Sequence, residues 1–282
     1  MTPPRLFGIP ARDAPVVAVL RRGPSDWCHI GRWDVGVQPA YQPGAWLRGT
    51  IYPQRCDLSP DGRWLAYFVL TGRPSADWRA GGTYVAVSRL PWASALAAWG
   101  TDGTWTQGVR FDDDRSVWDV GEPDEGDAMP CRARYGLGWG RSVSYAVERR
   151  TGWTETPDGP AYDERDPWEI QRAPQLTMAR PRPGGGATLQ VAGAYAAFRS
   201  FDTRHYGDPV YRLTGGLVGG AVDRVLTGVQ WADWTADGRL LVATSDGHLQ
   251  VRAGGGDDVT WESDLAALAP DPQPPPPEAA RW

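Results

Sequence analysis

The chain contains neither lysine nor asparagine, so arginine supplies all 29 of its basic side chains. The codons of arginine, alanine, glycine, proline and tryptophan are GC-rich, and a GC-rich genome explains this composition most simply. A planar guanidinium nevertheless differs from an ammonium group, because it can stack on the face of an indole ring. We therefore expect some arginine and tryptophan side chains to pack against one another at the protein surface.

Signals for a membrane or for nucleic acid are also missing. Residues 1–8 lack the basic region and apolar run of a signal peptide, and no segment reaches the roughly 18 apolar residues of a membrane-spanning helix. The formal net charge is −5 and the arginines are dispersed. Nucleic-acid binding normally draws on a concentrated basic surface. The sequence predicts a cytoplasmic protein with no membrane and no nucleic-acid partner.

Cysteine is scarce, and its three positions are Cys28, Cys56 and Cys131. An odd number at wide spacing suits free thiols in a reducing compartment. Cys28, His29 and Cys56 are the one candidate metal cluster. Their spacing matches no zinc pattern, and adjacent residues of a strand point to opposite faces. We expect buried structural cysteines, no metal and no cofactor.

The sequence contains no recognisable catalytic motif. The three histidines, His29, His205 and His248, have no neighbouring nucleophile or metal-ligand motif, and no Gly-x-Ser-x-Gly, P-loop or His-Glu-x-x-His sequence occurs. The acidic stretch 112–127 lacks the carboxylate spacing of an EF-hand, which favours solvated loop charge over calcium binding. A non-enzymatic protein is expected. Paired carboxylates that meet only in the folded chain, as in glycosidases built on propellers, remain the alternative.

Turn-forming and aromatic residues, in contrast, are abundant, with 35 glycines, 26 prolines and 16 tryptophans in 282 residues. The clearest pattern runs from Cys56 to Leu70, where a short strand, an Asp-Gly turn and an apolar strand follow one another, and it returns in weaker form at Trp231–Thr244. Asp-Gly tolerates the positive φ values that tight hairpins need. Repeated hairpins and many short strands predict an all-β fold.

The segment Leu58-Ser59-Pro60-Asp61-Gly62-Arg63-Trp64-Leu65-Ala66-Tyr67 resembles the "SPDGRWLAY" hairpin of TolB-type and WD40-like β-propeller repeats. The whole chain also resembles uncharacterised bacterial propeller-like proteins. This resemblance implies a fold of four-stranded blades and no particular activity. Asp61 and Asp237 are 176 residues apart, which equals four repeats of 44 residues and lies within the roughly 40–50 residues of a propeller blade. We expect a β-propeller-like array of about five or six four-stranded blades, with one short helix and long loops.

The expected domain covers residues 1–269, followed by a proline-rich tail at 270–282. The tail serves either as a recognition peptide with Trp282 as its anchor or as a terminal segment that lies back on the domain or stays disordered. Residues 90–100 are expected to be the helix, because Pro91 starts an alanine-rich segment that ends at Gly100, and a strand is the alternative. The expected strands include residues 16–20, 27–35, 64–70, 83–89, 104–111, 115–120, 142–149, 188–191, 194–201, 209–214, 229–235, 239–244, 248–252 and 259–262.

These features favour a protein-binding module or scaffold that presents aromatic and arginine-rich loops on a rigid propeller. Tryptophan, tyrosine and arginine supply many interface hot spots. The candidate binding residues are near expected loops or strand ends or in the tail, and core packing is the alternative for most of them: Trp27, Trp33, Trp78, Trp105, Trp168 and Trp282. Two other functions remain open. One is a propeller-type hydrolase or lyase acting on a carbohydrate-like substrate, and the other is a small-ligand-binding module with a concave pocket.

Overall fold

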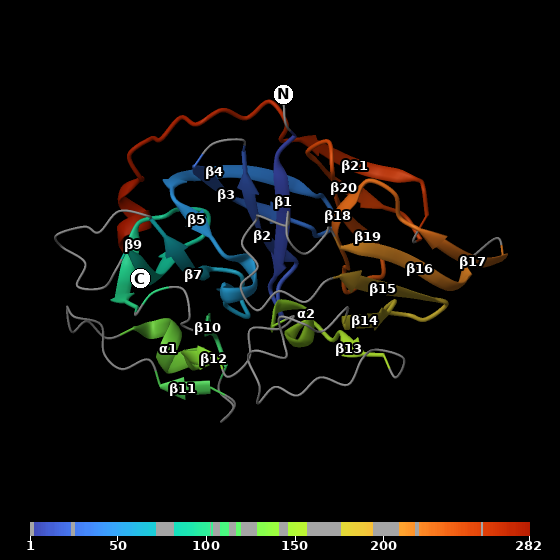
Figure 1. The fold of residues 1–282 in the computed structure, drawn as a ribbon, viewed down its shortest axis with the longest axis horizontal. Helices are drawn as coiled ribbons and strands as arrows, with labels where there is room; N and C mark the ends of the chain where they lie inside the picture. Colours follow the sequence, from blue (N-terminus) through green and yellow to red (C-terminus); the bar gives the residue numbers. More distant parts are fainter. Residues whose placement is uncertain are drawn as a thin grey trace.

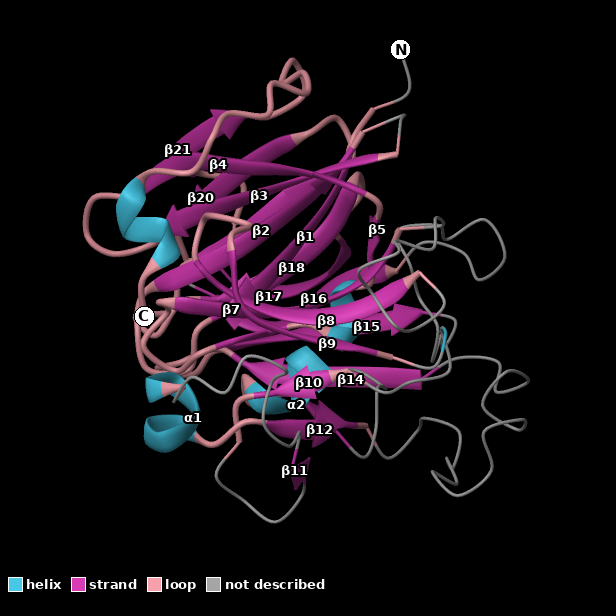
Figure 2. Ribbon diagram, turned by 90° about the vertical axis from the view of Figure 1, so that its left-hand side faces the viewer, coloured by secondary structure: helices cyan, strands magenta, loops and turns pink. Residues whose placement is uncertain are grey.

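The computed structural model describes residues 3–23, 26–71, 82–101, 103, 108–112, 117–119, 129–140, 146–156, 176–193, 209–217, 220–254 and 256–282. Strands dominate this part of the chain, as Figure 1 and Figure 2 show. They form five antiparallel sheets, which we number in chain order. The all-β prediction is therefore confirmed. Within the described residues, no helix is long and apolar enough to cross a membrane.

The first and fifth sheets have the expected four strands, and the second departs from this only because two short strands share its first position. The first contains β1 (Arg5–Pro10), β2 (Val16–Arg22), β3 (Trp27–Asp34) and β4 (Ala40–Arg48). In the second, β5 (Thr50–Ile51) and β6 (Asp57–Leu58) both pair with β7 (Trp64–Leu70), which continues to β8 (Thr83–Arg89) and β9 (Ala95–Gly100). The 3-10 turn η1 (Pro53–Arg55) lies between β5 and β6. The fifth contains β18 (Val229–Trp234), β19 (Leu240–Thr244), β20 (His248–Arg252) and β21 (Val259–Asp264).

The third and fourth sheets depart from a regular four-stranded unit. The third has the order β10 (Val109–Arg110), β12 (Gly138–Gly140), β11 (Val117–Asp119). The strands expected at 104–111 and 115–120 therefore do not pair with each other as a hairpin, because β12 lies between them. The fourth contains β13 (Thr154–Glu155), β14 (Leu176–Pro181), β15 (Ala187–Gly193), β16 (Val210–Leu217) and β17 (Gly220–Val225). The strand expected at 194–201 and most of the acidic stretch 112–127 lie outside the described residues.

Two expected elements have the wrong type. Residues 95–100 form β9 instead of a helix, because β9 pairs with β8 and buries Ala97 and Trp99 in the core. This tertiary packing outweighs the intrinsic helix preference of alanine, which is only a few tenths of a kcal/mol per residue. Conversely, the described end of the strand expected at 142–149 is helical. The described residues contain two short α-helices, α1 (Pro130–Tyr135) and α2 (Ala146–Arg150).

The Asp-Gly turns are held by a hydroxyl group that precedes the aspartate. Ser59 Oγ accepts hydrogen bonds from the backbone N–H groups of Arg63 (3.1 Å) and Trp64 (2.9 Å), and donates to Asp61 Oδ1 at 2.7 Å. In the equivalent turn of the fifth sheet, Thr235 Oγ1 accepts from Arg239 N at 2.9 Å and donates to Asp237. Glycine is required next because the backbone there has a positive φ of 72° in the first turn and 79° in the second.

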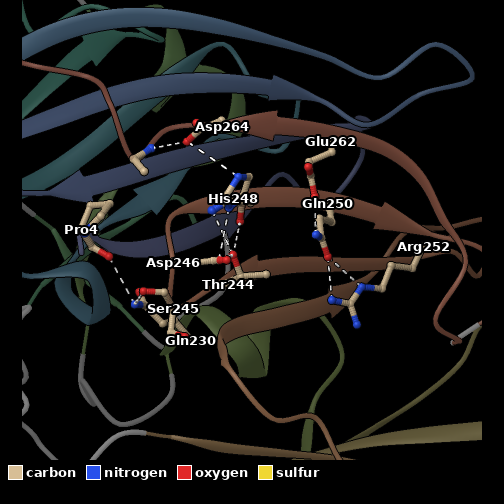
Figure 3. Close-up of polar contacts among 11 residues, drawn as sticks. Pro4, Gln230, Thr244, Ser245, Asp246, His248, Gln250, Arg252, Glu262 and Asp264 are labelled. Atoms are coloured by element: carbon tan, nitrogen blue, oxygen red, sulfur yellow. Dashed lines mark hydrogen bonds and ion pairs between the residues drawn. The ribbon is translucent and has the colours of Figure 1, made fainter. Parts of the chain in front are cut away.

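Figure 3 shows a third turn of this kind, between β19 and β20. Thr244 Oγ1 accepts from His248 N at 2.9 Å and donates to Asp246. The backbone of Gly247 has a φ of 99°. The pattern that predicts the two Asp-Gly turns does not include this one, because its flanking residues differ from theirs. The same local chemistry therefore builds two consecutive corners of the fifth sheet.

Four clusters of buried apolar side chains join neighbouring sheets. They join the first sheet to the second (Leu20, Leu65), the second to the third (Phe68, Val109), the fourth to the fifth (Leu213, Val242) and the fifth back to the first (Leu241, Val19). The first and fifth sheets are also connected through Gln230, whose Oε1 accepts from Leu6 N at 2.7 Å and whose Nε2 donates to Pro4 O at 3.2 Å (Figure 3). Sheets from opposite ends of the chain are thus packed together.

Arginines connect the sheets at the level of the Asp-Gly turns. Arg32 of the first sheet donates to Gly62 O at 3.2 Å, and Arg182, which follows β14, donates to the equivalent Gly238 O at 2.8 Å. Arg239 Nη2 of the fifth sheet donates to Val35 O at 2.8 Å. Because a guanidinium carries five donors in a fixed plane, it suits such bridges between backbone carbonyls.

The proline-rich tail extends from the fifth sheet to the second sheet, as Figure 1 shows. The residues just before the tail are held by Arg21, which donates to Leu265 O at 2.8 Å and to Leu268 O at 2.7 Å. Near its end, the 3-10 helix η3 (Pro277–Ala280) buries Ala279 completely, and Arg89 donates to Glu278 O at 3.1 Å. The side chain of Trp282 packs against the cluster shared by the second and third sheets.

His29 is a buried, neutral histidine of the first sheet. Its Nε2 accepts a hydrogen bond from Gly44 N at 3.2 Å, so its proton is on Nδ1, which lies 3.2 Å from the hydroxyl of Tyr41. Burial, reinforced by the charge of Arg21, lowers the pKa of His29 to about 4. The unfolded chain therefore binds a proton at this position between about pH 6.5 and 4 that the folded chain does not bind.

We expect the stability of the protein relative to its His29→Gln variant to fall as the pH falls. The difference in unfolding free energy should decrease by about 2 kcal/mol between pH 7.5 and 5, as measured by urea denaturation. His248→Gln is the matched control. Burial lowers the pKa of His248, but the hydrogen bond to Asp246 and the neighbouring carboxylate charges together outweigh burial, so the pKa is raised. The difference in unfolding free energy between the protein and His248→Gln should therefore increase as the pH falls. A pH-independent difference for His29→Gln would contradict the neutral, buried assignment.

Candidate functional site

The candidate tryptophans do not form one binding surface in the described residues. Trp33 is completely buried in the cluster of the first and fifth sheets, where it stacks on Trp261 with ring centroids 5.6 Å apart. Trp27 is half-buried at the start of β3, and Trp282 belongs to a different cluster. Trp78, Trp105 and Trp168 lie outside the described residues. Arginine stacks on tryptophan at Trp46, under Arg21, and at Trp64, under Arg63. Arg21 and Trp64 are buried, however, whereas these contacts were expected at the protein surface.

A cavity of about 510 Å³ opens at the end of the sheets where the Asp-Gly turns lie. It is bounded by the β1–β2 turn, the β3–β4 turn, the β18–β19 turn, the residues at the end of α2, and β14. Its walls consist of residues 10–17, 35–37, 150–151, 180, 234–237, 239 and 241. The first, fourth and fifth sheets and one helix thus contribute to a single concave site.

Two structurally equivalent aspartates hold arginines at this cavity. Asp57 and Asp233 each lie four residues before the aspartate of an Asp-Gly turn, and each side chain is 3% exposed. Asp57 pairs with Arg150, and Asp233 pairs with Arg180. Because these arginines also line the cavity, the repeat places two ion pairs, one from the second sheet and one from the fifth, beside the same space.

The pair of the second sheet has few donors besides the guanidinium. Asp57 Oδ1 lies 2.8 Å from Arg150 Nη2, and Asp57 Oδ2 accepts from Phe111 N at 2.7 Å. Burial raises the pKa of Asp57 to about 6, and the charge of Arg150 opposes this shift. Arg110 lies in the same charged cluster, where burial and then repulsion from Arg150 lower its pKa to about 10. Asp57 is therefore shared by two arginines, one of which, Arg150, lines the cavity.

The pair of the fifth sheet is held by more groups. Asp233 Oδ1 accepts hydrogen bonds from Arg180 Nη1, from Trp153 Nε1 at 3.2 Å and from its neighbour's backbone, Trp234 N, at 2.8 Å. Thr151 Oγ1 approaches Asp233 Oδ2 at 3.4 Å. Burial raises the pKa of Asp233, and Arg180 opposes this shift. These contacts fix the position of the arginine and occupy the carboxylate, an arrangement that suits binding better than proton transfer.

Sequence reasoning missed both ion pairs. A signal was present, since aligning the two hairpins at Asp61 and Asp237 places an aspartate at the same position of the preceding strand in both copies. An acidic residue among apolar strand residues is costly to bury unless it is paired. The partners Arg150 and Arg180 come from segments with no repeat pattern, and only the folded chain identifies them.

No group of three or more histidine, cysteine, aspartate or glutamate side chains converges as a metal site in the part of the chain that the structure describes. The cysteines are buried free thiols, and burial raises the pKa of both Cys56 and Cys131 to about 12. Thiolate chemistry is therefore disfavoured at these two positions.

Comparisons with known proteins assign no family. No protein-family model matches the chain, and no curated protein matches it. A solved structure of an uncharacterized protein from Listeria monocytogenes is 10% identical to this chain, with a TM-score of 0.28. The match covers 93% of this chain and 66% of that protein, just under two thirds of its length.

Proposed function

We propose that the protein is a non-enzymatic binding module, built as an irregular β-propeller, which holds a small ligand in the cavity at the end of its sheets. The observation that carries this proposal is the cavity itself. Its volume of about 510 Å³ is in the range of roughly 300–1,000 Å³ that small-molecule sites occupy. Its walls combine apolar residues with a few fixed polar groups, which is the usual composition of such sites.

The packing of the sheets supports a propeller. Apolar clusters join the sheets in the order four, five, one, two, three, which is the neighbour order of a ring whose first and last blades meet. The proposal requires that the third and fourth sheets complete the ring. It gives five blades, and the irregular strand numbers of the third and fourth sheets account for the weak repeat in the middle of the chain.

The cavity is tested by filling it. Ala236 is exposed on the β18–β19 turn and lines the cavity, so Ala236→Trp should block it without disturbing the core. Ala221→Trp, on the exposed face of β17, is the matched control. We expect a thermal-shift screen of small molecules to find compounds that stabilise the protein and Ala221→Trp by several degrees but leave Ala236→Trp unchanged. A screen without any compound that separates the two variants would refute the proposal.

Protein binding through the loop tryptophans is a separate proposal. It concerns Trp27, Trp282 and the tryptophans outside the described residues, Trp78, Trp105 and Trp168. Recovery of one stoichiometric partner by affinity purification from native lysate would support it, and loss of that partner on deletion of residues 270–282 would place recognition in the tail.

A further inference from the structure

We infer that the ligand of this cavity is an amphipathic anion, whose acidic oxygens bind Arg150 and whose apolar body lies against the apolar rim formed by Pro15, Val37 and Ala236. This inference rests on the proposed function of the cavity and specifies the chemical class of the ligand.

The unused donor of Arg150 is the first observation. Its Nη2 is paired with Asp57 Oδ1 at 2.8 Å and lies 3.5 Å from Cys56 O. Its Nη1 is buried and, within the described residues, has no hydrogen-bond partner. A buried N–H of a charged group is costly to leave unpaired. The Arg150 side chain is 18% exposed and lines the cavity, so an acidic oxygen there would lie beside a guanidinium whose donors are not all used, and a guanidinium is well suited to bind one.

The second observation is that the arginines are held in place before a ligand arrives. Arg150 is fixed by Asp57 of the second sheet, and Arg180 is fixed by Asp233 and by Trp234 O at 3.3 Å. Their side chains are only 18% and 17% exposed. An anion therefore meets ordered, partly desolvated guanidinium groups, which strengthens the interaction relative to a mobile surface arginine.

The charge around Arg150 is balanced and does not oppose an anion. Besides its partner Asp57, the charged groups around it are Arg110 of β10, Asp112 and Arg149, and Arg149 is paired with Glu155. Farther along the cavity, Arg12 is paired with Asp13 and Arg239 with Asp237. Each of these carboxylates is thus accompanied by an arginine, so an anion meets guanidinium groups at the cavity.

The apolar wall defines the rest of the ligand. The exposed part of this wall is formed by Pro15, by Ala236 and by Val37, which is 96% exposed, while Val16, Val17, Val35 and Leu241 lie buried behind them. A carbohydrate would instead stack on an open aromatic face. The one tryptophan of the lining, Trp234, is 3% exposed, and its Nε1 donates to Arg180 O at 3.2 Å. An alkyl or aryl acid fits these walls better than a sugar.

The test uses three probes with the same chain and different head groups: octanoate, 1-octanol and octylammonium. Binding to the full chain is measured at pH 7.5 by calorimetry or ligand-observed NMR. We expect octanoate to bind at least tenfold more tightly than octanol, and octylammonium not to bind. Arg150→Lys keeps a charge beside Asp57 but loses the planar Nη1 donor, and it should weaken octanoate at least fivefold while leaving octanol unchanged.

Arg212→Lys is the matched control, because Arg212 forms an exposed pair with Asp223 and does not line the cavity. Its octanoate affinity should be that of the unmodified protein, and the thermal midpoint of each variant establishes that it is folded. Octanol binding as tightly as octanoate, or equal octanoate affinity in Arg150→Lys, would overturn the inference and leave the binding function intact. If none of the probes binds, the inference fails. If the small-molecule screen also finds no compound blocked by Ala236→Trp, the proposed function fails with it.

Discussion

Replacing Asp233 with alanine should lower the free energy of unfolding by about 3–5 kcal/mol, the cost of leaving a buried charge without its partner. The substitution removes the acceptor of three donors: the guanidinium of Arg180, the indole N–H of Trp153 and the backbone N–H of Trp234. The Asp233 side chain that accepts these bonds is only 3% exposed, so water cannot readily replace it. The midpoint of thermal unfolding should fall by roughly 10 °C. Urea denaturation of the protein and the variant at pH 7 provides the measurement.

Asp223→Ala is the control for this substitution. Asp223 also pairs with an arginine, Arg212 Nε, at 2.6 Å, but its side chain is 61% exposed. Exposed pairs contribute little to stability because water and salt screen them, so this variant should remain close to the unmodified protein. Equal effects of the two substitutions would mean that the pair of Asp233 is not buried as the structure places it.

Trp33→Ala should also cost about 3–5 kcal/mol, because it removes a completely buried indole from the interface of the first and fifth sheets. Trp33→Phe should cost less than about 2 kcal/mol. The indole Nε1 of Trp33 is buried without a hydrogen-bond partner in the described residues, so phenylalanine loses no hydrogen bond there and keeps an aromatic contact to Trp261. Chemical denaturation of both variants tests the prediction.

Trp27→Ala, on the same strand, is the comparison, since Trp27 is only half-buried. Its loss of stability should be well below that of Trp33→Ala. The sequence-based hypothesis gave both tryptophans the same binding role, and the structure separates them. Trp33→Ala with unchanged stability would return Trp33 to the list of surface candidates.

The local sequence was sufficient to predict the Asp-Gly turns between strands. The Ser59 and Thr235 turns were predicted because their chemistry is complete within five residues, where a hydroxyl, an aspartate and a glycine satisfy the backbone. The strands of the fifth sheet were predicted for a similar reason, since short connections leave each strand beside its neighbour in the sequence. The segment 95–100 failed because pairing with β8, which is a non-local interaction, decided its conformation.

The sequence by itself determined the all-β class and the positions of the Asp-Gly hairpins, because turn chemistry and strand alternation act over a few residues. Only the tertiary structure decided which arginine meets which aspartate. Asp57 and Arg150 are separated by 93 residues and Asp233 and Arg180 by 53, and no local pattern links either pair. The cavity depends on the same long-range packing, since it exists only where turns of the first and fifth sheets, β14 and the end of α2 come together.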